Sequence, residues 1–286
     1  MKIDQATVLL TGAAGGIGSA TARELGRNGA RLLLADLAAE PLSALADELR
    51  AAGVAAEFAA GNLADRDERA QIVARASALG VNVLINLAGI NPFGLFAEQS
   101  VEELERVFLV NTTVPVVLCR EMLPVLRARS AASIVNVGSA FGAIGFPAFA
   151  AYSASKFAIR GFSEALRREL EDSAIGVHYV APRATRTRLV TDRVRAMNEA
   201  LGVAMDSPEV VAREIVRALA AGRRERAIGF PERFFAKING LFPALVDRAL
   251  RKQLATIVRF ASPTSEPPRN ARRPQPILHA PQETPQ

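Results

Sequence analysis

A serine, a tyrosine and a lysine lie close together near the middle of this chain, and their chemical types suit proton transfer. Tyr152 and Lys156 are four residues apart, so on a helix they share a face, and Ser139 precedes the tyrosine by thirteen residues. A phenol has a reference pKa of about 10, and a nearby ammonium favours the phenolate and lowers that pKa. A hydroxyl that orients an oxygen, a phenol that moves its proton and a cation that tunes the phenol together suit the interconversion of an alcohol and a carbonyl.

A glycine-rich stretch follows the first apolar segment, residues 6–11. It reads TGAAGGIG over residues 11–18, with glycines at 12, 16 and 18. Such a turn lets the backbone approach a phosphate, and the helix that follows offers free N–H groups and the positive end of its dipole. The spacing is G-x-x-x-G-x-G, and a plain strand-to-helix turn is the alternative interpretation.

An acidic residue, Asp36, ends the second expected strand, residues 30–36. A carboxylate there can accept hydrogen bonds from both hydroxyls of an adenosine ribose and repels a 2′-phosphate. Residues 13–17 hold no Arg or Lys, and Leu37 follows the acid. The pattern therefore favours NAD over NADP, although an exposed aspartate at a strand end would look the same.

Apolar segments typical of strands alternate with amphipathic segments typical of helices. The expected strands are 6–11, 30–36, a third before a turn at Gly61 and Asn62, 81–89, 132–139 and 175–182, and the expected helices include 41–52, 65–79, 100–129, 151–172 and 207–219. This alternation predicts an α/β fold with a doubly wound parallel sheet of the Rossmann type, in one domain with a C-terminal helical extension. Ser139 falls at the C-terminal end of a strand, where ligands bind in such sheets.

The expected helix over 100–129 begins with a capping box, in which Ser100 is the N-cap and Glu103 lies three residues on. Asn111 and Pro115 lie inside it. Proline has no N–H, so the carbonyl of residue 111 loses its usual donor. That carbonyl could hold a water that feeds protons toward Lys156; the alternative is a kink that serves packing only.

Together these segments resemble the short-chain dehydrogenase/reductase family over about residues 5–220. The motifs TGAAGGIG, Asp36, NLAG, Asn111, Ser139, YSASK and VAPRATRT stand in the order of that family. The resemblance implies a catalytic set of Asn111, Ser139, Tyr152 and Lys156, and homodimers or homotetramers. The cofactor-binding residues that it implies are Gly12, Ala14, Gly16, Ile17, Gly18, Asp36, Asn62, Leu63, Asn86, Ala88, Gly89, Tyr152, Lys156, Pro182, Arg183, Thr185 and Thr187.

Three residues depart from the pattern of the family. Asn62 stands where an aspartate is usual, and Leu87 replaces the second asparagine of N-N-A-G. Arg183 replaces the glycine after Pro182, so it either reshapes the nicotinamide end of the cofactor site or offers a cation to substrate or phosphate.

Composition bounds the other classes of function. The single cysteine, Cys119, excludes an internal disulfide, and the two histidines, His178 and His279, are too few and too separated to predict a metal site. Of the net charge of +6, residues 222–286 supply the excess, with 12 Arg or Lys against 5 Asp or Glu. No aromatic and basic platform accompanies this charge, so nucleic-acid binding is not expected. The start of the chain lacks a signal-like apolar region and no apolar run reaches about 18 residues, so we expect a cytoplasmic protein.

The C-terminal part divides into a lid, an extension and a tail. Residues 187–205 fall where the family carries a mobile substrate lid. Residues 230–260 are apolar at a helical period, broken by Pro243 and interspersed with cations. They could lie on an anionic membrane surface at the inner face of a membrane, cover the substrate mouth, or dock on the body or on another subunit. The expected domains are 1–222 for NAD binding and catalysis, 223–260 for the basic helical extension, and 261–286 for a disordered proline-rich tail.

The combined prediction is an oxidoreductase that uses NAD, with NADP as the alternative, to interconvert a secondary alcohol and a ketone. Phe93, Phe96, Phe141, Phe146 and Phe149 fall on loops expected around the site, which favours an apolar small-molecule substrate of the lipid, acyl or steroid kind. Two alternatives stay open. One is a dinucleotide-binding regulatory or scaffold protein without turnover, and the other is the same fold catalysing dehydration or epimerisation.

Overall fold

The computed structural model of the chain describes residues 1–230 and 232–262. The strands are β1 (Thr7–Thr11), β2 (Arg31–Asp36), β3 (Ala56–Ala60), β4 (Val83–Asn86), β5 (Ala132–Val137), β6 (Ile175–Ala181) and β7 (Glu225–Ala227). The α-helices are α1 (Gly16–Arg27), α2 (Ala39–Ala51), α3 (Arg66–Ala78), α4 (Val101–Phe108), α5 (Val114–Arg127), α6 (Ala150–Glu169), α7 (Asp192–Ala200), α8 (Pro208–Ala220), α9 (Glu232–Leu241) and α10 (Pro243–Ala261). The predicted disorder of residues 261–286 lies outside the described residues, except that Ala261 closes α10 and Ser262 follows it.

The strands form one parallel sheet in the order β3-β2-β1-β4-β5-β6-β7, which confirms the predicted doubly wound fold. The chain reaches the edge at β3 and returns through α3 to β4, which pairs with β1. The strand order therefore reverses between β1 and β4, and the carboxyl ends of these two strands border the crevice where ligands bind in such folds.

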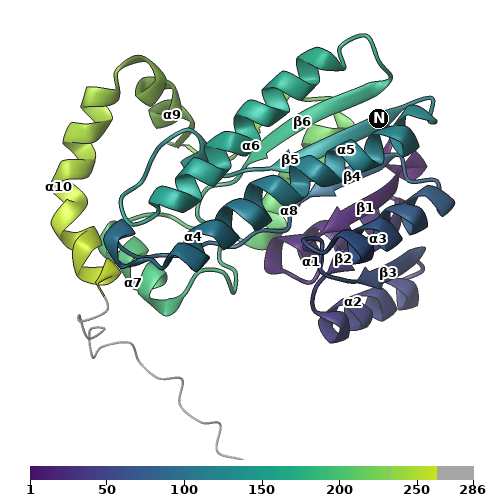
Figure 1. The fold of residues 1–286 in the computed structure, drawn as a ribbon, viewed down its shortest axis with the longest axis horizontal. Coiled ribbons are helices and arrows are strands. Elements are labelled where there is room, and N and C mark those ends of the chain that lie inside the picture. The colour runs from purple at the N-terminus through teal and green to yellow at the C-terminus, as the bar shows by residue number, and fades with distance from the viewer. Residues whose placement is uncertain (231, 263–286) are drawn as a thin grey trace, which may run out of the picture.

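Both faces of the sheet are covered by helices, which explains why its strands are apolar throughout instead of alternating. Val8 and Leu10 of β1 belong to a core shared with α1, α2 and α8, whereas Leu9 between them belongs to a second core shared with α3, α5 and α6. Helices α4, α5 and α6 run along the sheet in Figure 1, and α9 and α10 stand at the side, away from its strands.

The helix expected over 100–129 is interrupted. The predicted capping box of Ser100 and Glu103 is present, but a five-residue π-helical turn, Leu109–Thr113, separates α4 from α5. At the end of this turn the Val114 N–H donates a hydrogen bond to the carbonyl of Leu109, five residues back. Pro115 cannot donate a backbone hydrogen bond, so the widened turn is a response to the missing donor. It turns Asn111 inward, where the residue is 1% exposed.

Residues 101–127, taken as one helix, are long and apolar enough to pass for a membrane span by length and composition. No such segment is expected from the sequence alone. Leu118, Met122 and Leu126 of this helix are fully buried in the core beneath the sheet. The helix is therefore a core element of this fold, and its apolar character has a packing explanation.

The C-terminal part differs from expectation in two elements. Residues 225–227, expected to open the helical extension, form the edge strand β7 beside β6. A three-residue strand carries no readable period, so the sequence did not reveal it. The expected lid contains a helix, α7, whose Thr191 N-cap accepts a hydrogen bond from the Val194 N–H.

Candidate active site

The glycine-rich loop after β1 is packed too closely for side chains at two positions. Gly12 has a φ of +68°, and a Cβ on it would lie 2.7 Å from the Ala88 nitrogen. A Cβ on Gly18 would lie 2.0 Å from the Gly12 carbonyl oxygen. The Thr11 hydroxyl oxygen accepts hydrogen bonds from the N–H groups of Leu87 and Ala88 at 3.1 and 3.3 Å. This threonine, which sequence reasoning did not assign a role, joins the loops after β1 and β4 into one wall.

Asp36 closes the far end of this wall. One carboxylate oxygen accepts a hydrogen bond from the Ala14 N–H at 2.9 Å, and the other accepts one from the Leu37 N–H at 2.7 Å. The carboxylate is thus fixed against the glycine-rich loop by the backbone. The second oxygen also accepts a hydrogen bond from the Ala38 N–H at 3.4 Å, so it is the oxygen bound to Ala14 that keeps capacity for a further donor, such as a ribose hydroxyl.

A cavity of about 910 Å³ runs along the carboxyl ends of the strands. Of the predicted site residues, it is lined by Gly12, Ala14, Gly16, Ile17, Asp36, Asn62, Leu63, Ala88, Gly89, Ser139, Tyr152, Lys156, Pro182, Arg183, Thr185 and Thr187. Gly18, Asn86 and Asn111 lie behind the wall. Asn86 is held there by hydrogen bonds from its amide group to Asn136 and Cys119, so its place in the structure is that of a support and not of a lining residue.

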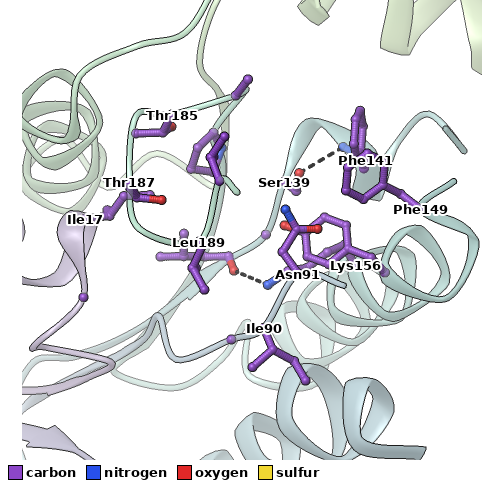
Figure 2. Close-up of a pocket in the computed structure, with 18 of the residues that line it drawn as sticks. Ile17, Ile90, Asn91, Ser139, Phe141, Phe149, Lys156, Thr185, Thr187 and Leu189 are labelled. Atoms are coloured by element: carbon purple, nitrogen blue, oxygen red, sulfur yellow. Dashed lines mark hydrogen bonds between the residues drawn. The ribbon is translucent and has the colours of Figure 1, made fainter. Parts of the chain in front are cut away.

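Three of the four predicted catalytic side chains, Ser139, Tyr152 and Lys156, line this cavity, and Figure 2 shows Ser139 and Lys156 there. Ser139 follows β5, and its hydroxyl oxygen accepts a hydrogen bond from the Phe141 N–H at 3.2 Å. Tyr152 and Lys156 are one turn apart on α6. The Lys156 ammonium donates to the Val137 carbonyl at 3.4 Å and lies 5.7 Å from the centroid of the Tyr152 ring. The hydroxyl, the phenol and the ammonium therefore line the same cavity.

Burial dominates the ionisation of this group. It raises the pKa of Tyr152, which a hydrogen bond with Ser139 partly offsets, and it lowers the pKa of Lys156 to about 8. The expected lowering of the phenol pKa by Lys156 is wrong for this structure. The reason is that both charged forms lose hydration in the apolar surroundings, and the loss outweighs the attraction expected from the ammonium.

Asn111 supports the site from behind. Its side-chain oxygen accepts a hydrogen bond from the Ile90 N–H, and its amide donates to the Ile90 carbonyl and to the Ser155 hydroxyl, at 2.9, 2.9 and 3.1 Å. Ser155 is a partner that sequence reasoning missed, although it lies between Tyr152 and Lys156 in YSASK. A Cβ on Gly89 would lie 3.1 Å from the Asn111 oxygen and 3.5 Å from the Lys156 nitrogen. Asn111 thus fixes the loop after β4 against the catalytic helix.

The other half of the cavity is apolar. Phe141, Phe146 and Phe149 line it, and the rings of Phe141 and Phe149 lie 6.3 and 6.2 Å from that of Tyr152. Figure 2 shows Phe141 and Phe149 beside Ser139, with Leu189 and Thr187 across the opening. Phe93 packs on Phe149 at 5.0 Å, behind the lining. Phe96, also expected at the site, is 62% exposed and does not line the cavity.

The lid and the C-terminal extension complete this apolar half. Val190 and Val194 come from the lid, and Val246, Ala249, Leu250 and Gln253 come from α10. Ile257 and Phe260 of α10 are buried against Val194 and Met197. Of the sequence alternatives, the structure therefore shows one inward face of the extension covering the cavity.

Arg183 is held by an acidic partner that sequence reasoning did not identify. Its guanidinium makes two hydrogen bonds to the Asp206 carboxylate, at 3.0 and 2.7 Å, and one to the Phe230 carbonyl at 3.4 Å. The side chains are 18% and 12% exposed. These bonds join the segment after β6 to the end of the lid and to the start of the extension.

The part of the cavity formed by the glycine-rich loop and Asp36 fits a dinucleotide. Gly12, Gly15 and Gly16 line the cavity with backbone alone and form a cradle there, and a Cβ on Gly16 would narrow it by lying 3.0 Å from the Thr187 methyl group. The start of α1 directs its free N–H groups to that cradle, and Asp36 stands at the end where the ribose would lie. Thr185 and Thr187 line the cavity across the opening from Ser139 (Figure 2).

Comparison with known proteins agrees with this geometry. The sequence profile of the family described as short chain dehydrogenase matches residues 6–198. Among curated relatives, the dehydrogenase/reductase SDR family member 7B of Bos taurus is 34% identical over 244 residues, which cover 80% of this chain and 75% of the relative. The uncharacterized oxidoreductase YxnA of Bacillus subtilis is 29% identical over 282 residues, which cover 95% of this chain and 77% of the relative.

Two solved structures are similar along most of the chain. A short-chain dehydrogenase from Sphingobium yanoikuyae in complex with NADPH has a TM-score of 0.72 and 27% identity, covering 85% of this chain and 95% of its own. A short chain dehydrogenase/reductase from Burkholderia phymatum in complex with NAD has a TM-score of 0.78 at 24% identity, covering 86% and 96%, and supports the fold alone.

Proposed function

Because the chain belongs to the short-chain dehydrogenase family and is an oxidoreductase of that family, we propose that it interconverts a secondary alcohol and a ketone on an apolar substrate with NAD(H). The observation that carries this proposal is the meeting of Ser139, Tyr152 and Lys156 beside a wall of phenylalanines in one cavity. The nicotinamide, when bound, supplies or accepts the hydride.

The residues of the chain then divide the work of moving the proton. Ser139 orients the substrate oxygen, and Tyr152 gives its proton to that oxygen in reduction or takes it in oxidation. Lys156 is held by the Val137 carbonyl and would hold the ribose next to the nicotinamide. Asn111 keeps the loop after β4 and the catalytic helix in register through Ile90 and Ser155. Residues 12–18 and Asp36 would hold the diphosphate and the adenosine ribose.

The preference for NAD rests on Asp36. Its carboxylate is fixed by the N–H groups of Ala14 and Leu37, so it cannot turn away from a 2′-phosphate without losing both bonds. A negative phosphate next to a fixed carboxylate is disfavoured. The relatives bound to NAD and to NADPH differ on this point, so the preference stays a proposal for this chain.

The apolar substrate follows from the walls of the inner cavity. Phenylalanines, valines and leucines from the loop after β5, the lid and α10 surround the phenol. The Arg183 cation lines the cavity as well but is neutralised by Asp206. Pockets of this kind select by apolar area, with a few polar groups fixing orientation. Lipid-, acyl- and steroid-like ketones fit this description, and sugars do not.

The test is consumption of NADH and NADPH by the purified full chain over a panel of long-chain acyl ketones, steroid ketones and sugars. Tyr152→Phe should lower turnover by about 10²–10⁴-fold, the usual contribution of an acid–base group, while NADH binding changes little. Tyr179→Phe is the matched control, because Tyr179 is the other tyrosine and is buried behind Ser139. NADH binding without turnover on any substrate would favour a regulatory binding protein instead. Loss of water from the substrate, or an epimerised product, would favour dehydration or epimerisation by the same fold.

A further inference from the structure

Helices α9 and α10 form a hairpin with two unlike faces. Val246, Leu250, Gln253 and Ile257 of α10 recur every three or four residues and face the cavity or the buried cluster beside it. Leu245, Arg248, Lys252 and Arg259 recur at three, four and seven residues, so they share the opposite face. The first face is explained by the substrate cavity, whereas the second is not.

The turn between the two helices is unusually apolar for a surface. Leu241, Phe242 and Leu245 at this turn are 73%, 60% and 57% exposed, and Phe234, seven residues before Leu241 and on the same face of α9, is 53% exposed. Of the 14 large apolar side chains that are exposed in the described part of the chain, seven fall in residues 230–254. Scattered exposed apolar residues are ordinary, but a contiguous group of this kind marks an interaction surface.

The hairpin is anchored at both ends, and near the turn the Asn239 side-chain amide donates to the Ala143 carbonyl at 3.0 Å while Val246 is buried against the cavity. Phe260 and Ile257 are buried in the cluster with the lid, and the Arg193 guanidinium donates to the Ser262 carbonyl at 2.6 Å. The turn itself lies at the tip, and Figure 1 shows α9 and α10 at the margin of the molecule, away from the sheet. Leu241, Phe242 and Leu245 remain exposed although the hairpin is held on both sides of them, so these side chains can enter a lipid bilayer while the contacts of Asn239 and Val246 stay in place.

The charge around this turn indicates which kind of partner its surface would bind. Helix α10 carries four cations, Arg248, Arg251, Lys252 and Arg259, against the single acid Asp247. Arg248, Arg251 and Lys252 are exposed. Aromatic and aliphatic side chains beside a row of cations match a bilayer with anionic headgroups, because the rings enter the interface while the cations meet lipid phosphates.

We propose that the α9–α10 hairpin docks on an anionic lipid bilayer, with Phe234, Leu241, Phe242 and Leu245 inserted and the outer cations of α10 on the headgroups. The inner face of α10 lines the cavity, so docking places the bilayer one helix away from the site. This inference goes beyond the proposed reaction and does not require turnover, because lipid binding is measured separately from catalysis.

Vesicle flotation of the full chain tests the proposal. Vesicles of phosphatidylcholine with phosphatidylglycerol should carry the protein, and vesicles of phosphatidylcholine alone should carry it weakly. The double variant Phe242→Ser, Leu245→Ser should weaken binding at least about tenfold, because each buried apolar side chain contributes about that factor or more. Arg248→Gln and Lys252→Gln should each weaken binding about fivefold, and added salt should do the same.

Two matched controls separate docking from general stickiness. Phe96→Ser removes a phenylalanine of nearly equal exposure, 62% against 60% for Phe242, on another part of the surface. Arg27→Gln removes an exposed cation of α1. Both variants should float like the unaltered chain. Loss of binding in these controls equal to that of the hairpin variants would overturn the proposal.

Failure of docking can also be told from failure of the proposed reaction. NADH binding and particle size are measured on the same samples. Absence of binding to anionic vesicles while NADH still binds would overturn the docking surface and leave the oxidoreductase intact. A larger particle that the double variant splits, without vesicle binding, would show that a second copy of the chain occupies the surface and would overturn the lipid proposal.

Discussion

The ammonium of Lys156 lies 5.7 Å from the centroid of the Tyr152 ring, and the protein encloses Lys156 almost fully and Tyr152 in part. Enclosure disfavours the phenolate and the ammonium alike, so it raises the pKa of Tyr152 and lowers that of Lys156 to about 8. Of the two groups, it is therefore Lys156 whose pKa is brought closer to neutral pH. A lysine that gives up its proton this readily is sensitive to pH in a range where exposed lysines are not.

The stability of the protein should depend on pH through Lys156. Its pKa is about 8 in the folded chain, against the ordinary lysine value of 10.5. Between these values the unfolded chain binds a proton that the folded chain does not, so stability rises with pH across this window. Below pH 8 the full cost of the buried ammonium is present, about 3 kcal/mol at most at about 1.36 kcal/mol per pKa unit.

Urea unfolding of the unaltered chain and of Lys156→Met across this range checks the expectation. The variant should be the more stable protein at neutral pH, and the difference should shrink as pH rises from 8 toward 10.5. Above about pH 10 the raised pKa values of Tyr152 and Tyr179 act in the opposite direction, so only the difference between the two proteins is informative. A constant difference would contradict the argument. Lys237→Met, at an exposed lysine of α9, serves as the control.

The ion pair of Arg183 and Asp206 should couple two distant segments. Both side chains are mostly buried and share two hydrogen bonds, so removal of either leaves a poorly hydrated charge. A double-mutant cycle of Arg183→Ala and Asp206→Ala should give a coupling energy of about 1–3 kcal/mol. The exposed pair Arg195 and Asp192, at 52% and 94% exposure, should give less than about 0.5 kcal/mol. Equal couplings, measured by urea unfolding, would refute this role.

Asp36 should set the choice between the two dinucleotides. Asp36→Asn keeps one oxygen as an acceptor but removes the charge that repels a 2′-phosphate. We expect the ratio of the dissociation constants for NADPH and NADH to fall about tenfold or more, which corresponds to about 1.4 kcal/mol. Fluorescence titration with each dinucleotide measures it, with the exposed Asp47→Asn as control. A wild-type chain that already binds NADPH more tightly would show that the cofactor preference is wrong.

The sequence was sufficient for those parts of the fold and site that depend on local patterns. Apolar strands alternating with helices predict a parallel sheet, and the capping box at Ser100 marks the start of α4, as found. The glycine spacing predicts a tight turn over residues 11–18, and in the structure Gly12 takes a φ of +68° there. Each of these features depends on residues that are neighbours along the chain.

The features that escaped prediction depend on tertiary contacts. Asp206 lies 23 residues from Arg183, and no spacing rule connects them before the lid folds back. The rise of the Tyr152 pKa follows from desolvation by surrounding segments, which a helical spacing cannot reveal. The strand β7 is three residues long and exists because β6 offers it an edge. The inward face of α10 could be read from its period, but not the cavity that it covers.

Two glycines, Gly18 in α1 and Gly161 in α6, should respond in opposite directions to substitution by alanine. A Cβ on Gly18 would meet the Gly12 carbonyl oxygen at 2.0 Å and the Ala13 Cα at 2.8 Å, both backbone atoms that cannot turn aside. Gly18→Ala should therefore displace α1 from the loop and lower stability by about 2–4 kcal/mol, as overpacking in a tight core does.

Gly161 lies within α6 with nothing within 4 Å of its Cβ position. Gly161→Ala should raise stability by about 0.5–1 kcal/mol, because alanine loses less backbone entropy in a helix. Thermal and urea unfolding measure both changes, and NADH titration should show weaker binding for Gly18→Ala alone. If Gly18→Ala were neutral in both measurements, the close contact between α1 and the glycine-rich loop would not exist in solution, and the cradle inferred for the diphosphate would lose its basis.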